Sequence, residues 1–145
     1  RRQCRPKFCG VTFQGAAKAT PSEAFSNALN RVRALVIAPS NPFVSIDPIL
    51  ALPGIRDALH RPDRPVVAVS PIVGGKAVKG PLAKMMSERG VDPSALGVAQ
   101  HYGGLVDGWV IDAADRDQRA SSESDLESSD SSTCVRAGQT RSHAT

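Results

Sequence analysis

The 145-residue chain is poor in aromatic side chains, has an odd number of cysteines and contains no long apolar run. Phe, Trp and Tyr make up only 4% of the residues, which argues against an aromatic-rich binder of carbohydrate or single-stranded nucleic acid. The three cysteines, Cys4, Cys9 and Cys134, form no C-x-x-C pair. Neither a zinc site nor a disulfide framework is therefore indicated, and a reducing compartment is expected.

The sequence also lacks an apolar stretch of about 18 residues and a signal-peptide pattern. We therefore expect a cytoplasmic protein with no membrane partner. The net charge is +4, but basic side chains crowd residues 1–7 and are otherwise scattered among acidic ones. Because no basic stripe or recognisable motif is present, we expect no nucleic-acid partner. The three histidines are far apart in the sequence, so metal coordination by His is not expected.

Three short apolar runs predict buried strands, over residues 34–38, 65–69 and 108–112. The first ends at Pro39 and is typical of a parallel strand that is covered on both faces. Thr20 and Asp92 are each followed by a proline and predict helix starts. Helices are expected over residues 20–30, 53–60, 82–89 and 92–102, and a further short strand over residues 11–13. Helices that alternate with apolar strands predict an α/β fold with a mainly parallel sheet.

The composition changes at Asp115. Residues 120–132 contain seven serines and several acids, with Leu126 as the single large apolar side chain. Such a segment buries too little apolar surface to offset the entropy lost on ordering. We expect a folded domain over residues 1–114 and a disordered Ser/Asp/Glu-rich tail over residues 115–145.

Residues 70–81 form a glycine-rich loop at the carboxyl end of a predicted strand. Gly74 and Gly75 allow backbone N–H groups to approach an anion closely, and Lys76 and Lys79 would neutralise phosphate oxygens. The Lys-Ser/Thr pair that a Walker motif needs is missing, and no G-x-G-x-x-G fingerprint occurs. A phosphate-binding loop and a plain glycine-rich turn both fit the sequence.

Residues 39–42 follow the neighbouring predicted strand and place Ser40 and Asn41 between two prolines. Ligands of parallel sheets bind at the carboxyl ends of strands, so this loop is the expected partner of residues 70–81. Asp47 suits a metal or a ribose hydroxyl, or is an exposed loop acid. His101 ends a helix, where the macrodipole favours a structural role. Trp109 is expected in the core.

Four segments together closely resemble the 2-phospho-L-lactate transferases, namely residues 39–46, 52–56, 66–81 and 96–99. Members transfer a phospholactyl or phosphoenolpyruvyl group from a guanosine-diphosphate-linked donor to the deazaflavin Fo. The reaction releases GMP in coenzyme F-420 biosynthesis, with magnesium as the cofactor. The resemblance therefore implies a transferase with a Rossmann-like three-layer fold and a mainly parallel sheet. It leaves open whether the donor carries phospholactate or phosphoenolpyruvate, and it is compatible with a homodimer.

The resemblance covers roughly residues 1–114. The chain starts with Arg1, which resembles the middle of the family chain, so the sheet is expected to be incomplete. The family's N-terminal half, with its acceptor-binding and metal-binding residues, has no counterpart here, and no catalytic or metal-ligating residue is assigned. Carried over by position, the residues implied to contact the donor nucleotide or its phosphates are Ser40, Asn41, Ser70, Gly74, Gly75, Lys76 and Lys79. The alternatives are a non-catalytic nucleotide- or phosphate-binding fragment and a relative that binds a uridine sugar nucleotide.

Overall fold

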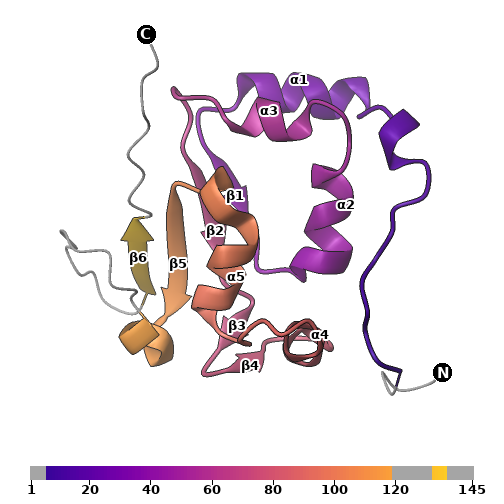
Figure 1. The fold of residues 1–145 in the computed structure, drawn as a ribbon. Coiled ribbons are helices and arrows are strands. Elements are labelled where there is room, and N and C mark those ends of the chain that lie inside the picture. Colours follow the sequence, from indigo (N-terminus) through magenta and orange to yellow (C-terminus); the bar gives the residue numbers. More distant parts are fainter. Residues whose placement is uncertain (1–5, 119–131, 137–145) are drawn as a thin grey trace, which may run out of the picture.

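The computed structural model describes residues 6–118 and 132–136, in which helices alternate with the strands of a sheet (Figure 1). The helical elements are η1 (Ala16–Lys18), α1 (Glu23–Arg31), the π-helical turn η2 (Pro42–Ile46), α2 (Asp47–Leu50), α3 (Ile55–Leu59), α4 (Leu82–Glu88), α5 (Ala95–Tyr102), η3 (Gly103–Leu105) and η4 (Ala113–Gln118). The strands are β1 (Leu35–Ile37), β2 (Val66–Val69), β3 (Ile72–Val73), β4 (Lys76–Ala77), β5 (Gly108–Asp112) and β6 (Ser132–Arg136).

The main sheet has the strand order β1-β2-β5-β6. Strand β2 pairs in parallel with β1 on one side and with β5 on the other, so that Ala68 lies between Ile37 and Trp109. Strand β6 adds an antiparallel edge to β5. This arrangement confirms the predicted α/β fold with a mainly parallel sheet. A separate two-stranded hairpin, β3–β4, follows β2 directly.

The two faces of the sheet differ in burial. Side chains on one face are almost fully buried and form the core with the helices; in the strands they are Ile37, Val66, Ala68, Trp109 and Ile111. On the opposite face Val36 is 66% exposed, while Val67, Val69 and Val110 are half-buried. The apolar run over residues 34–38 predicts burial on both faces, so Val36 departs from that prediction. A run of apolar residues shows that a strand can be buried but does not show what covers it.

Two stretches of the chain differ from the sequence prediction. Residues 11–13 form no strand, and the chain there runs irregularly into η1. The tail prediction for residues 115–145 falls mostly on residues 119–131 and 137–145, which lie outside the described part. Within the described part, however, η4 reaches Gln118, and Ser132–Arg136 pairs with β5. Strand β5 would otherwise leave one edge of its backbone hydrogen-bonding groups unpaired, and β6 satisfies this edge.

Serine side chains start the two long helices. Ser22 caps α1 by accepting a hydrogen bond from the Phe25 backbone N–H at 3.2 Å, and Ser94 caps α5 through Gly97 N–H at 3.0 Å. The predicted caps were Thr20 and Asp92, two residues earlier in each case. In both segments a proline separates the predicted cap from the observed one, and this proline lies before the helix and not at its first position. Among residues 6–118, no helix has the length and apolar character needed to cross a membrane.

The buried Arg64 links α1 to α3. Arg64 is 2% exposed, and its guanidinium donates hydrogen bonds to the backbone carbonyls of Leu29 in α1 and Ala58 in α3. Both carbonyls lie near helix ends, where backbone oxygens have no partner within the helix. Arg64 thus satisfies the ends of two helices that are distant in sequence and lie side by side in Figure 1.

Helix α5 gives a stability prediction. A Cβ atom placed on Gly97 would lie 2.1 Å from the Asp92 backbone oxygen, so the loop before α5 can pack closely only against a glycine. We expect Gly97→Ala to lower the free energy of unfolding by about 1–3 kcal/mol. This is the opposite of the usual effect, since replacing Gly by Ala within a helix normally stabilises the helix by about 1 kcal/mol. Urea denaturation measures the change. The exposed Gln100→Ala in the same helix is the control and should change stability by under about 0.5 kcal/mol; an equally stable Gly97→Ala chain would contradict the packing.

Candidate functional site

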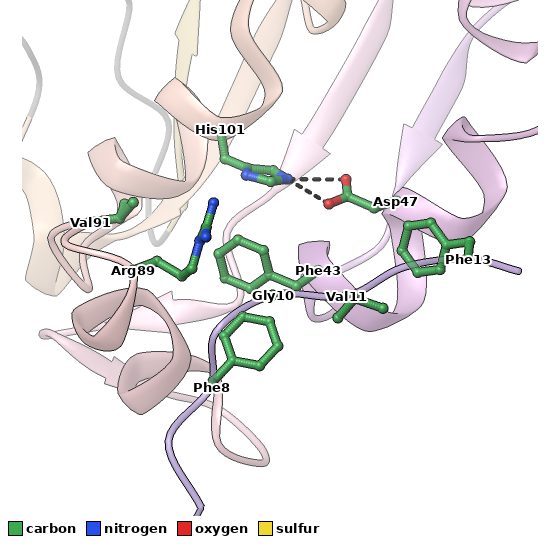
Figure 2. Close-up of a pocket in the computed structure, with 9 residues that line it drawn as sticks. All are labelled: Phe8, Gly10, Val11, Phe13, Phe43, Asp47, Arg89, Val91 and His101. Atoms are coloured by element: carbon green, nitrogen blue, oxygen red, sulfur yellow. Dashed lines mark hydrogen bonds and ion pairs between the residues drawn. The ribbon is translucent and has the colours of Figure 1, made fainter.

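A pocket of about 350 Å³ opens between the N-terminal segment and the helices that follow β1 and β2 (Figure 2). Four separate segments line it: the N-terminal residues 8–13, the η2–α2 region, the residues after α4, and α5. The lining residues are Phe8, Gly10, Val11, Phe13, Phe43, Asp47, Arg89, Val91 and His101. The pocket thus combines apolar walls with a few polar side chains, which is the usual character of a small-molecule site.

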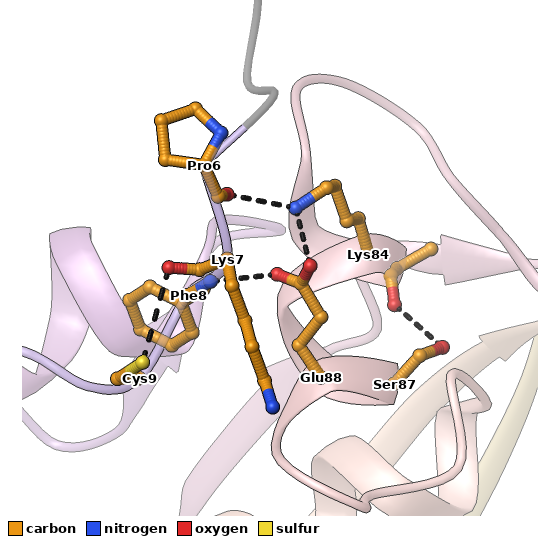
Figure 3. Close-up of polar contacts among 8 residues, drawn as sticks. Pro6, Lys7, Phe8, Cys9, Lys84, Ser87 and Glu88 are labelled. Atoms are coloured by element: carbon orange, nitrogen blue, oxygen red, sulfur yellow. Dashed lines mark hydrogen bonds and ion pairs between the residues drawn. The ribbon is translucent and has the colours of Figure 1, made fainter.

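Polar side chains of α4 hold the N-terminal segment in place as one wall of the pocket (Figure 3). Lys84 Nζ donates to the Pro6 carbonyl at 3.0 Å and forms an ion pair with Glu88 Oε1 at 2.5 Å. Glu88 Oε2 accepts a hydrogen bond from the Phe8 backbone N–H at 2.8 Å. The hydrogen bond from Lys84 and then that from Phe8 hold the pKa of Glu88 below its usual value. Glu88 therefore stays ionised near neutral pH and keeps Phe8 against the pocket.

The few aromatic side chains of the chain gather at this pocket. Ring centroids lie 5.6 Å apart for Phe8 and Phe43 and 4.9 Å apart for Phe43 and His101. The row of rings continues from His101 through Tyr102 to Trp109, with 5.6 Å between neighbours. Trp109 is buried at the far end, as predicted. Of the Phe, Tyr and Trp residues, Phe25 alone lies away from the pocket and this row.

His101 and Asp47 form a pair at the pocket wall. The Nε2 atom of His101 lies 3.0 Å from each carboxylate oxygen of Asp47, and both side chains are about one-fifth exposed. The fold joins residues that are 54 positions apart, which explains why sequence reasoning assigned only local roles to each. Burial raises the pKa of the adjacent Tyr102, and the negative charge of Asp47 raises it further. The Tyr102 phenol is therefore neutral.

The two loops predicted to bind a ligand start at the same edge of the sheet. Because β1 and β2 are parallel neighbours, residues 39–42 and 70–81 both follow their carboxyl ends. In the first loop Asn41 has a structural role. Its side-chain oxygen accepts from Phe43 N–H at 3.0 Å, and its amide nitrogen lies 3.3 Å from Met85 Sδ. Ser40 beside it is half-buried.

The glycine-rich loop folds as the β3–β4 hairpin. Gly74 and Gly75 form its turn with φ values of 55° and 73°, a left-handed conformation that favours glycine. The Gly74 N–H donates to both carboxylate oxygens of Asp115, at 2.9 and 3.1 Å, and Asp115 is only 1% exposed. The anion that this backbone N–H binds in the structure is therefore a side chain of the protein itself.

The remaining predicted residues lie around this hairpin. Ser70 is buried, and its hydroxyl both donates to the Ile72 carbonyl and accepts from the Ile72 N–H, at 2.9 and 3.1 Å. Lys76 and Lys79 are exposed. None of the seven predicted residues lines the pocket. Sequence reasoning missed Phe8, Arg89 and the pairing of His101. The sequence shows that aromatic residues are scarce, but it does not show that they come together in the fold.

Magnesium, which the resemblance implies, needs oxygen ligands from carboxylates or phosphates. Among residues 6–118 and 132–136, no three His, Cys, Asp or Glu side chains gather where they could hold a metal ion. The described residues therefore provide no cluster of three protein ligands, and a magnesium ion here would take further ligands from phosphate oxygens of a bound molecule.

Comparison with known proteins identifies the family. A phosphoenolpyruvate transferase from Streptomyces coelicolor is 45% identical over 104 residues, which are 71% of this chain and 33% of the relative. A 2-phospho-L-lactate transferase from Methanosarcina mazei is 40% identical over 111 residues, which are 77% of this chain and 36% of the relative. Another from Methanocaldococcus jannaschii is 42% identical over 107 residues, which are 74% of this chain and 34% of the relative. The chain thus spans about a third of the length of these curated relatives. Residues 2–142 match the family described as 2-phospho-L-lactate transferase CofD, and the chain belongs to this family.

Proposed function

We propose that this chain takes part in the transfer of a phospholactyl or phosphoenolpyruvyl group from a guanosine-diphosphate-linked donor to the deazaflavin Fo, in coenzyme F-420 biosynthesis. The observation that carries the proposal is the family match over residues 2–142, together with relatives named as transferases of these two groups. Because the chain spans only about a third of those relatives, the activity of the whole protein is part of the proposal.

In the proposed reaction the acceptor hydroxyl oxygen attacks the phosphorus of the transferred group. A new P–O bond forms, the P–O bond to the leaving GMP breaks, and the hydroxyl loses its proton. Such reactions depend mainly on positioning and on neutralising negative charge. We propose that the carboxyl edge of the sheet supplies this positioning for the donor phosphates through Ser40, Asn41, Ser70, Gly74, Gly75, Lys76 and Lys79.

The seven proposed donor-site residues differ in their exposure and in the hydrogen bonds that they already form. Lys76 and Lys79 are exposed next to the hairpin turn and are the groups most accessible to a phosphate. Ser70 and Asn41 already have hydrogen-bond partners within the fold. At Gly74 a phosphate would compete with the buried Asp115 carboxylate. The proposal therefore gives the two lysines the larger share of phosphate binding.

Turnover tests the proposed function. Incubated with Fo and the guanosine-diphosphate-linked donor, the chain should release GMP in a magnesium-dependent manner, because magnesium is proposed to balance the charge of the phosphates. Chromatography measures GMP and the Fo product with magnesium and with EDTA. If guanosine diphosphate binds and no product forms, the chain is a non-catalytic nucleotide binder.

Charge removal tests the donor site. We expect the double variant Lys76→Gln/Lys79→Gln to bind guanosine diphosphate about threefold to tenfold more weakly, since exposed charge contacts each contribute up to about 1 kcal/mol. The salt dependence of binding should also weaken. Calorimetric titration at two salt concentrations measures both effects, and uridine diphosphate serves as the competing nucleotide. Lys18→Gln, an exposed lysine of η1, is the matched control. Equal affinity of the double variant and the control would place the phosphates elsewhere.

A further inference from the structure

The pocket beneath the N-terminal segment is lined by two charged side chains, Arg89 and Asp47. Asp47 contacts His101 at 3.0 Å. The Arg89 guanidinium forms no ion pair with an acid of the lining. The other lining residues, including three phenylalanines, are apolar or glycine. Arg89 is exposed, so its guanidinium is accessible to an anion that enters the pocket, and water and salt screen the attraction between them.

The position of Arg89 is fixed by the N-terminal segment. Arg89 Nη1 donates to the Cys9 backbone carbonyl at 3.0 Å, and a Cβ atom on Gly10 would lie 3.9 Å from the same nitrogen. The hydrogen bond to Cys9 uses one of the five N–H donors of a guanidinium. In Figure 2 the guanidinium lies between Val91 and Phe43 and points toward His101. The arginine is thus anchored at one corner while its head faces the pocket.

A guanidinium in this position selects a particular kind of ligand. Its planar fork matches the two oxygens of a carboxylate and binds them through parallel hydrogen bonds. The faces of Phe8 and Phe43 beside it suit a small carbon skeleton. His101, which Asp47 holds in a fixed orientation, adds a polar group on the far side of Phe43. The lining therefore fits a small molecule with a carboxylate at one end, a carbon body in the middle and a second polar group beyond.

We propose that this pocket binds the three-carbon carboxylate part of the transferred group, with Arg89 on its carboxylate and Phe8 and Phe43 on its carbons. The inference rests on the proposed function, because the relatives are named for 2-phospho-L-lactate and phosphoenolpyruvate. Both compounds carry a carboxylate on the carbon that bears the phosphate ester, and they differ in the hybridisation of the carbons. The shared carboxylate meets Arg89, and the differing carbons meet the apolar wall.

Two phosphate esters test the role of Arg89 directly. In propan-2-yl phosphate a methyl group replaces the carboxylate of 2-phospho-L-lactate, while the rest of the skeleton is unchanged. We expect the full chain to bind 2-phospho-L-lactate about fivefold more tightly than propan-2-yl phosphate, as measured by calorimetric titration, because an exposed charge pair contributes up to about 1 kcal/mol. Phosphoenolpyruvate should show the same preference over propan-2-yl phosphate.

Substitution of Arg89 should remove the preference and leave phosphate-dependent binding in place. In Arg89→Gln the two ligands should bind with affinities within about twofold of each other. In Arg89→Lys, which keeps the charge but not the fork, the preference should fall at least about twofold. Arg56→Gln removes an exposed arginine of α3 outside the pocket and should keep the preference. Thermal unfolding verifies the fold of each variant, and Arg89→Lys decides the test where Arg89→Gln does not unfold cooperatively.

The inference is overturned where the wild-type chain binds the two esters equally, binds neither, or keeps its preference after substitution of Arg89. The assay requires no donor nucleotide, no acceptor and no turnover. An Arg89-dependent preference without product formation would contradict the proposed function alone. Product formation with an Arg89-independent preference would contradict this inference alone.

Discussion

The parallel pairing of β2 with both β1 and β5 is the constraint on which the rest of the fold depends. Val66 and Ala68 at the centre of β2 are 0% and 1% exposed, so this strand cannot shift in register without exposing its core side chains. Asp107 fixes the start of the pairing, because its carboxylate accepts from Val66 N–H and its backbone N–H donates to the Val66 carbonyl, each at 2.8 Å. The carboxyl ends of β1 and β2 consequently meet at one edge, where the π-helical turn η2 and the β3–β4 hairpin begin.

The pocket forms where elements from different parts of the chain pack together in this arrangement. Helix α2 brings Asp47, helix α5 brings His101, and α4 holds the N-terminal segment through Lys84 and Glu88. Each lining segment comes from a different part of the chain, so no local motif encodes the pocket. The pocket nevertheless uses half of the aromatic residues in a sequence that has few. An apolar wall, a guanidinium and a histidine thus face the same space.

Local sequence signals predicted the sheet well but did not predict the pocket. The apolar runs located β2 and β5 to within one residue, because burial and period are properties of consecutive residues. The helix caps were displaced by two residues, since a proline fits either side of a helix start. Gly74 and Gly75 form a turn, which was one of the two structures that fitted the sequence, and the Gly74 N–H binds a carboxylate. Asp115, assigned to the tail, supplies that anion from 41 positions away, and such a partner is invisible to local patterns. Local patterns likewise placed Arg89 and His101 only at helix ends, because the residues that they contact are distant in the sequence.

Hydrogen–deuterium exchange of the whole chain, with and without 2-phospho-L-lactate, tests most directly whether the pocket is the ligand site. Exchange reports the opening of backbone hydrogen bonds and of mobile segments, and the N-terminal segment is held by few of them. If the ligand binds Arg89 in the pocket, exchange should slow in residues 8–13 and 89–91, while β5 in the core should be unchanged. Slower exchange confined to residues 70–81, or no change in residues 8–13, would contradict a ligand site beneath the N-terminal segment.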